Sequence, residues 1–154
     1  YKGADTEEFK EIVKQVPEGF TLFLCSDYLD DTKEHEFRAA VFVNETTKEV
    51  IAASSGTRFG ATVEGFHDMY NDVFLAFESV PPKMQSVKKL NELILENLKD
   101  DVGEYKIHYT GHSLGADISD MAAADMAIKC RAAGKTPKDI ISMTFENPGD
   151  RAII

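Results

Sequence analysis

The feature that most constrains this fold is a β-rich run that leads, through a short turn, into a long helical run. Residues 105–109 predict a short strand, and the alanine-rich residues 114–133 predict a helix that Gly134 closes. A second long helix is predicted over residues 83–98, because its apolar side chains recur at intervals of three and four. These side chains are Val87, Leu90, Ile94 and Leu98. Strands that alternate with such helices indicate an α/β domain with a largely parallel sheet.

An antiparallel hairpin is predicted upstream of these elements. Residues 37–43 and 50–53 are β-rich, and the polar residues 44–48 between them are turn-like. Residues 140–145 predict a further strand, which a turn at Asn147-Pro148-Gly149 follows. The expected sheet is therefore mixed, mostly parallel with the hairpin at its N-terminal side.

The rest of the chain predicts two more helices. Residues 6–16 form an amphipathic pattern with Thr6 as the N-cap, and the apolar run 20–25 follows it. Residues 64–77 predict an aromatic-rich helix, after which Pro81-Pro82 interrupts the helical pattern.

Length and charge exclude several classes of function. The 154 residues fit one domain, 1–154, and carry a net charge of −10. Such an acidic surface argues against nucleic acid and anionic membranes as partners. We expect a soluble chain, since no run is long enough to span a membrane and the first residues lack the apolar core of a signal peptide. Cys25 and Cys130 are expected to be free, buried thiols, which leaves the compartment open.

The short turn itself reads Gly111-His112-Ser113-Leu114-Gly115. A Gly-x-Ser-x-Gly string is weak evidence alone, but here a predicted strand precedes it and a predicted helix follows it. That context is the strand–turn–helix geometry in which a strained serine becomes a nucleophile. Gly111 and Gly115 allow the strand and helix backbones to approach, and the helix N-terminus directs its N–H groups toward the serine oxygen.

This segment, with Thr110 before it and Ala116 after it, resembles the nucleophile elbow of the class 3 (fungal-type) lipases of the α/β-hydrolase superfamily. The resemblance extends over residues 37–149. Residues 50–57 are similar to the family's hairpin and its Arg-Gly-Ser/Thr loop, with Ser55 where the family usually has Arg. Asp72-Val73 loosely matches a later Asp-Leu/Phe pair, and residues 143–149 match the strand and the Pro-containing turn.

The resemblance implies a three-layer α/β-hydrolase sandwich and hydrolysis of carboxylic esters, such as acyl lipids, through an acyl-Ser113 intermediate. It also implies an oxyanion hole formed by the backbone N–H groups of Leu114 and Thr57, which fits the need of acyl transfer for two preorganised donors. The expected partner is a small ester or lipid substrate. No cofactor and no metal are expected, and the acidic loop 27–31 lacks the pattern of a calcium site.

What the motif lacks is a base. The family places an acid and then a histidine after the serine, but His35, His67, His108 and His112 all precede Ser113. Asp139 and Asp150 follow it, yet neither can be assigned as the triad acid without a histidine to orient. Three interpretations stay open: the chain is the N-terminal part of a longer hydrolase domain whose remainder completes the site, it is an inactive lipase-like interaction module, or it is one half of a two-chain hydrolase.

Structural rather than catalytic roles are expected for the histidines that precede Ser113. The turn should direct His112 away from Ser113, and His108 should lie on the strand beneath the motif, pointing into a helix layer as a core residue. His67 has the best position for lining a cleft, and His35 lies in a charged loop.

Two other groups of residues have alternative interpretations. Asp117 and Asp120 favour the dipole at the start of the helix. The aromatic residues after the Thr57 loop face the core or, as in lipases, form a lid or acyl pocket. They are Phe59, Phe66, Met69, Tyr70, Phe74 and Phe77.

Overall fold

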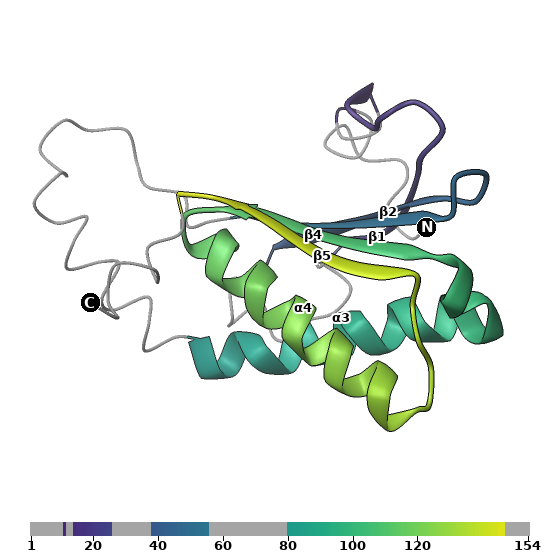
Figure 1. The fold of residues 1–154 in the computed structure, drawn as a ribbon. Coiled ribbons are helices and arrows are strands. Elements are labelled where there is room, and N and C mark those ends of the chain that lie inside the picture. Colours follow the sequence, from purple (N-terminus) through teal and green to yellow (C-terminus); the bar gives the residue numbers. More distant parts are fainter. Residues whose placement is uncertain (1–10, 12–13, 26–37, 56–79, 147–154) are drawn as a thin grey trace, which may run out of the picture.

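The computed structural model describes residues 11, 14–25, 38–55 and 80–146 (Figure 1). The strands in these ranges form one mixed sheet in the order β1-β2-β3-β4-β5. They are β1 (Thr21–Cys25), β2 (Ala39–Asn44), β3 (Glu49–Ser54), β4 (Lys106–His112) and β5 (Asp139–Phe145). The first three strands pair antiparallel, and β3, β4 and β5 are parallel. The predicted mixed sheet with an N-terminal hairpin is confirmed; where a mostly parallel sheet was expected, two of the four pairings among the described strands are parallel.

The hairpin forms because Asn44 caps its turn. The side-chain Oδ1 of Asn44 accepts hydrogen bonds from the backbone N–H groups of Thr46 and Thr47, at 3.0 and 2.9 Å. Such Asx turns replace the backbone pairing that a tight connection cannot make. The register then aligns β2 with β3 along all six residues of each strand.

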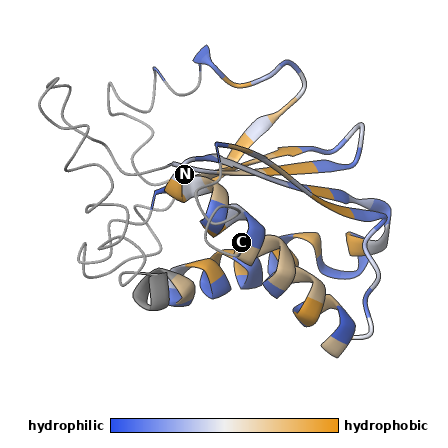
Figure 2. Ribbon diagram, turned by 60° about the vertical axis from the view of Figure 1, so that its left-hand side comes forward, coloured by the Kyte–Doolittle hydropathy of each residue, from blue (hydrophilic) through white to orange (hydrophobic). Residues whose placement is uncertain are grey.

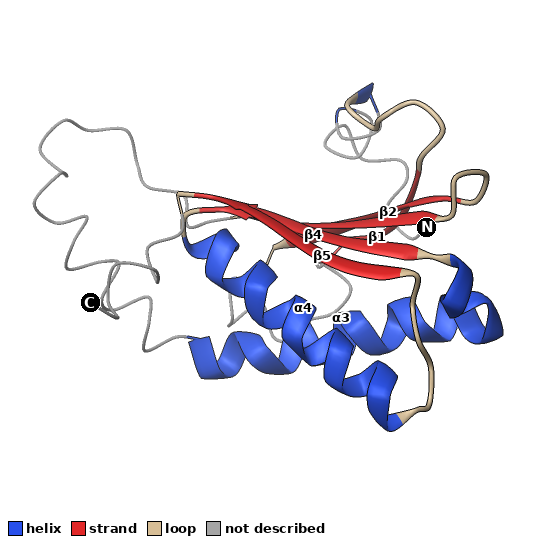
Figure 3. Cartoon of the chain, viewed as in Figure 1, coloured by secondary structure: helices blue, strands red, loops and turns tan. Residues whose placement is uncertain are grey.

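Two long helices, α3 (Val80–Leu98) and α4 (Leu114–Ala132), lie on one face of this sheet (Figures 1 and 3). The short helix η3 (Lys99–Glu104) connects α3 to β4. The predicted start of α3 was three residues late, because Pro81 and Pro82 lie in its first turn. Proline is tolerated there, since the first N–H groups of a helix have no intrahelical acceptor.

Helix α4 ends where the sequence predicted. Gly134 has a φ of +66°, and its N–H donates to the carbonyl of Arg131, while the N–H of Lys135 donates to that of Cys130. This pair of bonds is a Schellman motif, which satisfies the last carbonyl groups of the helix.

The core lies between the sheet and the two helices. Buried positions alternate along β2, β3 and β4, and both long helices carry hydrophobic and hydrophilic residues (Figure 2). Val41, Val50 and Ile107 on the strands are fully buried, as are Val87 on α3 and Met126 on α4. Within the described ranges, neither helix is long and apolar enough to cross a membrane.

Candidate functional site

Ser113 occupies a single-residue turn between β4 and α4. Strand β4 ends at His112 and helix α4 begins at Leu114, so the chain reverses within this one residue. Its backbone angles are φ 56° and ψ −129°, outside the regions that non-glycine residues ordinarily adopt. A residue held in such a conformation costs about 1–3 kcal/mol, and it persists only where the surroundings force it.

The first of these surroundings is a close contact between two glycines. A Cβ atom at Gly111 would lie 2.1 Å from the carbonyl oxygen of Gly115 and 2.3 Å from its carbonyl carbon. Both atoms belong to the backbone of the first turn of α4. Gly111 is therefore required for the helix to start this close to the strand, as the sequence predicted for these glycines.

Hydrogen bonds hold the turn on both sides. The N–H of Ser113 donates to the carbonyl of Phe145 at the end of β5, at 3.0 Å. The carbonyl of Ser113 accepts from the N–H of Ala116, at 2.8 Å. The backbone of Ser113 is thereby fixed to the neighbouring strand and to its own helix.

The start of α4 suits an anion. Ser113 is the N-cap residue but makes no side-chain capping bond, so its hydroxyl is not used to close the helix. Leu114, the first helical residue, is buried. Backbone N–H groups at a helix N-terminus point outward and carry partial positive charge, which stabilises a nearby oxyanion. Asp117 lies in the first turn as expected, and Asp120 accepts a hydrogen bond from Ser142 on β5.

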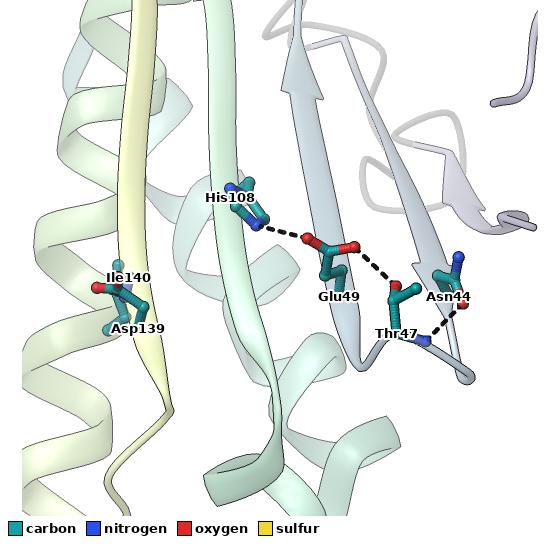
Figure 4. A network of polar contacts seen from close by, with 6 residues as sticks. All are labelled: Asn44, Thr47, Glu49, His108, Asp139 and Ile140. Atoms are coloured by element: carbon teal, nitrogen blue, oxygen red, sulfur yellow. Dashed lines mark hydrogen bonds and ion pairs between the residues drawn. The ribbon is translucent and has the colours of Figure 1, made fainter.

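The two histidines in the described ranges, His108 and His112, pair with glutamates and not with Ser113. The prediction that His108 points into the helix layer is wrong: its neighbour Tyr109 points at α3, so His108 lies on the opposite face of the sheet. There its Nε2 is 3.6 Å from Oε1 of Glu49 (Figure 4). His112 is exposed, and its Nε2 lies 2.9 Å from Oε2 of Glu146. In the described part of the chain, no cluster of His, Cys, Asp and Glu could hold a metal ion.

Several predicted site residues lie outside the described residues. Among them are Thr57, the second expected oxyanion donor, and the histidines His35 and His67. The same is true of these predicted features: the aromatic residues between 59 and 77, the acidic loop 27–31, the helix at 64–77, most of the helix at 6–16, Asp72-Val73 and Asp150.

Cys25 and Cys130 are buried thiols outside any disulfide, as predicted.

A buried polar network behind the site escaped the sequence analysis. The hydroxyl of Tyr109 on β4 donates to Oδ1 of Asn91 on α3, at 2.7 Å. Nδ2 of Asn91 in turn donates to the carbonyl of Ala122 and to Oδ2 of Asp125, both on α4 and both at 2.9 Å. Burial raises the pKa of Tyr109 well above its usual value. The network fastens both helices to the strand that carries the Ser113 turn.

Comparison with known proteins adds the family context. The family model for lipase (class 3) matches residues 26–149. An uncharacterized protein of Rickettsia prowazekii is 28% identical over 141 residues, which cover 90% of this chain and 35% of the relative. The chain therefore spans about a third of the length of this curated relative.

Two solved fungal lipase structures share the fold. The native Rhizomucor miehei lipase propeptide complex matches with a TM-score of 0.51 and 19% identity, over 85% of this chain and 42% of that one. A fungal lipase–inhibitor complex matches with a TM-score of 0.53 and 17% identity, over 73% and 43%. These matches show the α/β-hydrolase fold.

Proposed function

This chain belongs to the class 3 lipase family, and from that premise we propose that it carries the nucleophilic half of a lipase-type serine hydrolase site. The substrate class is a carboxylic ester, an acyl lipid or a smaller ester. Ser113 is the proposed nucleophile. Its Oγ attacks the ester carbonyl, the alcohol leaves, and water then hydrolyses the acyl-Ser113 intermediate.

The observation that carries this proposal is the conformation of Ser113. A strained serine at the junction of a parallel strand and a helix presents its hydroxyl at the carboxyl end of that strand, where a substrate carbonyl can approach. The close contact between Gly111 and Gly115 and the bond from Ser113 to Phe145 hold this geometry in place. Backbone strain of this size at a site-facing residue supports a functional role.

The N–H of Leu114 is the proposed first donor of the oxyanion hole. It belongs to the residue after the nucleophile and lies at the N-terminus of α4, where the helix dipole adds to its effect. The N–H of Thr57 is the proposed second donor. Together they would stabilise the negative charge that develops on the carbonyl oxygen during attack.

The proton of Ser113 needs an acceptor, and neither described histidine suits the role. His108 is five residues away along β4, roughly 16 Å of extended chain, and faces Glu49. His112 is paired with Glu146. Because the chain spans less than half the length of the lipases it matches, we propose that a base and its orienting acid come from polypeptide outside these residues.

A fluorophosphonate probe tests the nucleophile, because it phosphonylates activated serines. In the presence of the polypeptide that is proposed to supply the base, we expect labelling that Ser113→Ala abolishes and that Ser142→Ala leaves unchanged, since Ser142 is an exposed serine on β5. The same variants are assayed with a p-nitrophenyl ester. Labelling that survives Ser113→Ala would assign the nucleophile elsewhere.

The same experiment separates the remaining interpretations. Labelling that appears only after addition of the C-terminal part of a longer family member would support a base supplied from outside the chain, on the same polypeptide or on a second one. Absence of labelling under every condition would refute the hydrolase proposal. That outcome would favour a non-catalytic module that keeps the fold and the serine.

A further inference from the structure

Helix α4 carries one buried polar side chain in an otherwise apolar or small-residue surface. Its buried positions include Gly115, Ala122, Met126 and Cys130, and among them Ser119 is fully buried. The hydroxyl of Ser119 donates to the backbone carbonyl of Thr110 on β4, at 2.7 Å. The bond joins the second turn of α4 to the strand residue just before Gly111.

Serine is an unfavourable choice for this position on packing grounds alone. A buried hydroxyl is destabilising unless it is hydrogen-bonded, and serine in a helix interior lowers helix propensity relative to alanine. Serines in helices commonly bond the carbonyl four residues earlier, in their own helix. Ser119 instead reaches across to the strand, so its bond fixes the two elements relative to each other.

The location of this bond gives it a role in the site. Thr110 and Ser119 lie on either side of the turn and enclose Gly111, Ser113 and Gly115. We propose that Ser119 is a positioning residue for Ser113: by tying α4 to the end of β4, it keeps the turn in the conformation that aims the Ser113 hydroxyl. The proposal rests on the proposed function of Ser113 and adds a residue that acts through it.

A second bond, one position along the helix, provides a matched control. Asp120 accepts a hydrogen bond from Ser142 on β5, so α4 is also tied to the neighbouring strand. Ser142 is exposed, and its bond does not enclose the turn. Ser119→Ala and Ser142→Ala therefore each remove one hydroxyl and one bond between α4 and a strand, but only the first releases the strand that leads into Ser113.

Amide hydrogen exchange measures the turn without requiring activity. The N–H of Ser113 is bonded to Phe145, and its exchange rate reports opening of the turn, whereas the amide of the fully buried Ile107 in β4 reports global unfolding. In Ser119→Ala we expect exchange at Ser113, relative to Ile107, to rise about five- to tenfold. In Ser142→Ala we expect this ratio to change less than about twofold.

Ser119→Cys separates the hydrogen bond from the volume of the side chain. A thiol fills the position but is a weak donor, so this variant should behave like Ser119→Ala. If Ser119→Ala does not fold, the cysteine variant carries the test. A Ser119→Cys variant that matches the wild type, or an unchanged exchange ratio in both variants, would overturn the proposal.

The labelling rate of Ser113 gives the readout that a purely structural role would not move. The labelling rate is measured at a temperature where all variants are folded. We expect this rate to fall about tenfold in Ser119→Ala and to stay unchanged in Ser142→Ala. Faster exchange with an unchanged labelling rate would refute positioning of the hydroxyl. If the wild type is not labelled under any condition, with or without the added C-terminal polypeptide, the proposed function fails, and the exchange ratios still decide whether Ser119 holds the turn.

Discussion

Gly111→Ala should damage this protein more than any other glycine-to-alanine change for which the structure gives the surroundings. The new Cβ would lie 2.1 Å from the carbonyl oxygen of Gly115, 2.3 Å from its carbonyl carbon and 2.9 Å from the amide nitrogen of Ala116. All three atoms are backbone, so no side chain can rotate away. Ordinary contact begins at 3.4 Å, so the start of α4 would have to retreat by about 1.3 Å.

The energetic cost follows from that retreat. Overpacking a core by one methyl group typically costs about 1–3 kcal/mol. A clash with the backbone of α4, which cannot rotate away, belongs at the upper end, so we expect a loss of about 3 kcal/mol. For a domain of this size, that corresponds to a melting temperature lower by about 6–12 °C. Because displacement of a nucleophile by about 1 Å can cost a hundredfold in rate, labelling of Ser113 should fall by about two orders of magnitude.

Gly103→Ala is the control. A Cβ at Gly103 would meet the carbonyl oxygen of Thr136 at 3.4 Å, which is ordinary contact, so this variant should melt within about 2 °C of the wild type. Both variants and the wild type are compared by thermal denaturation followed by circular dichroism, and by the rate of fluorophosphonate labelling. Equal melting temperatures for the two variants would refute the argument that α4 and β4 meet at these glycines.

Two further predictions concern the network behind the site. Asn91→Ala should lower the free energy of unfolding by about 2–4 kcal/mol in urea denaturation, because it leaves the buried hydroxyl of Tyr109 and the acceptors on α4 without their partner. A loss below about 1 kcal/mol would mean that water replaces the side-chain amide of Asn91 and would contradict this prediction. Tyr109 should make the free energy of unfolding fall as the pH rises. Burial raises the pKa of Tyr109 in the folded protein above the unfolded value of about 10. The contribution of Tyr109 to the free energy of unfolding is therefore complete below about pH 10 and declines above it. Tyr109→Phe should flatten the curve of urea midpoint against pH above 10, and an unaltered slope would contradict this assignment.

Local patterns in the sequence were sufficient to predict strands β2 to β5 and the two long helices α3 and α4. The spacing of Val87, Leu90, Ile94 and Leu98 follows from helix geometry, and all four are buried in α3. Gly134 ends α4 because its positive φ is accessible to glycine without strain, a property of the residue itself. Strand β4 extends three residues beyond its predicted end because Thr110, Gly111 and His112 pair with β5, a partner that lies over thirty residues away in sequence.

What the sequence could not predict depends on which face of the sheet the helices cover. His108 and Tyr109 are adjacent, and alternation places them on opposite faces, but only the packing of α3 decides which one is buried beneath a helix. For the same reason the contacts of Asn91 with Tyr109 and Asp125 could not be predicted. They join residues 18 and 34 positions apart, and an asparagine in an amphipathic helix gives no sign of its partners.

The serine at the turn is the point where local and global requirements conflict. Glycine would adopt the backbone angles of Ser113 without strain, yet the chain has a side chain there and places glycines at 111 and 115 instead. The glycines bring the strand and helix together, the bond to Phe145 fixes the turn, and Ser119 ties the helix to the strand. These contacts stabilise a conformation that costs about 1–3 kcal/mol. A hydroxyl at a position where the backbone favours glycine supports the proposal that Ser113 is the nucleophile.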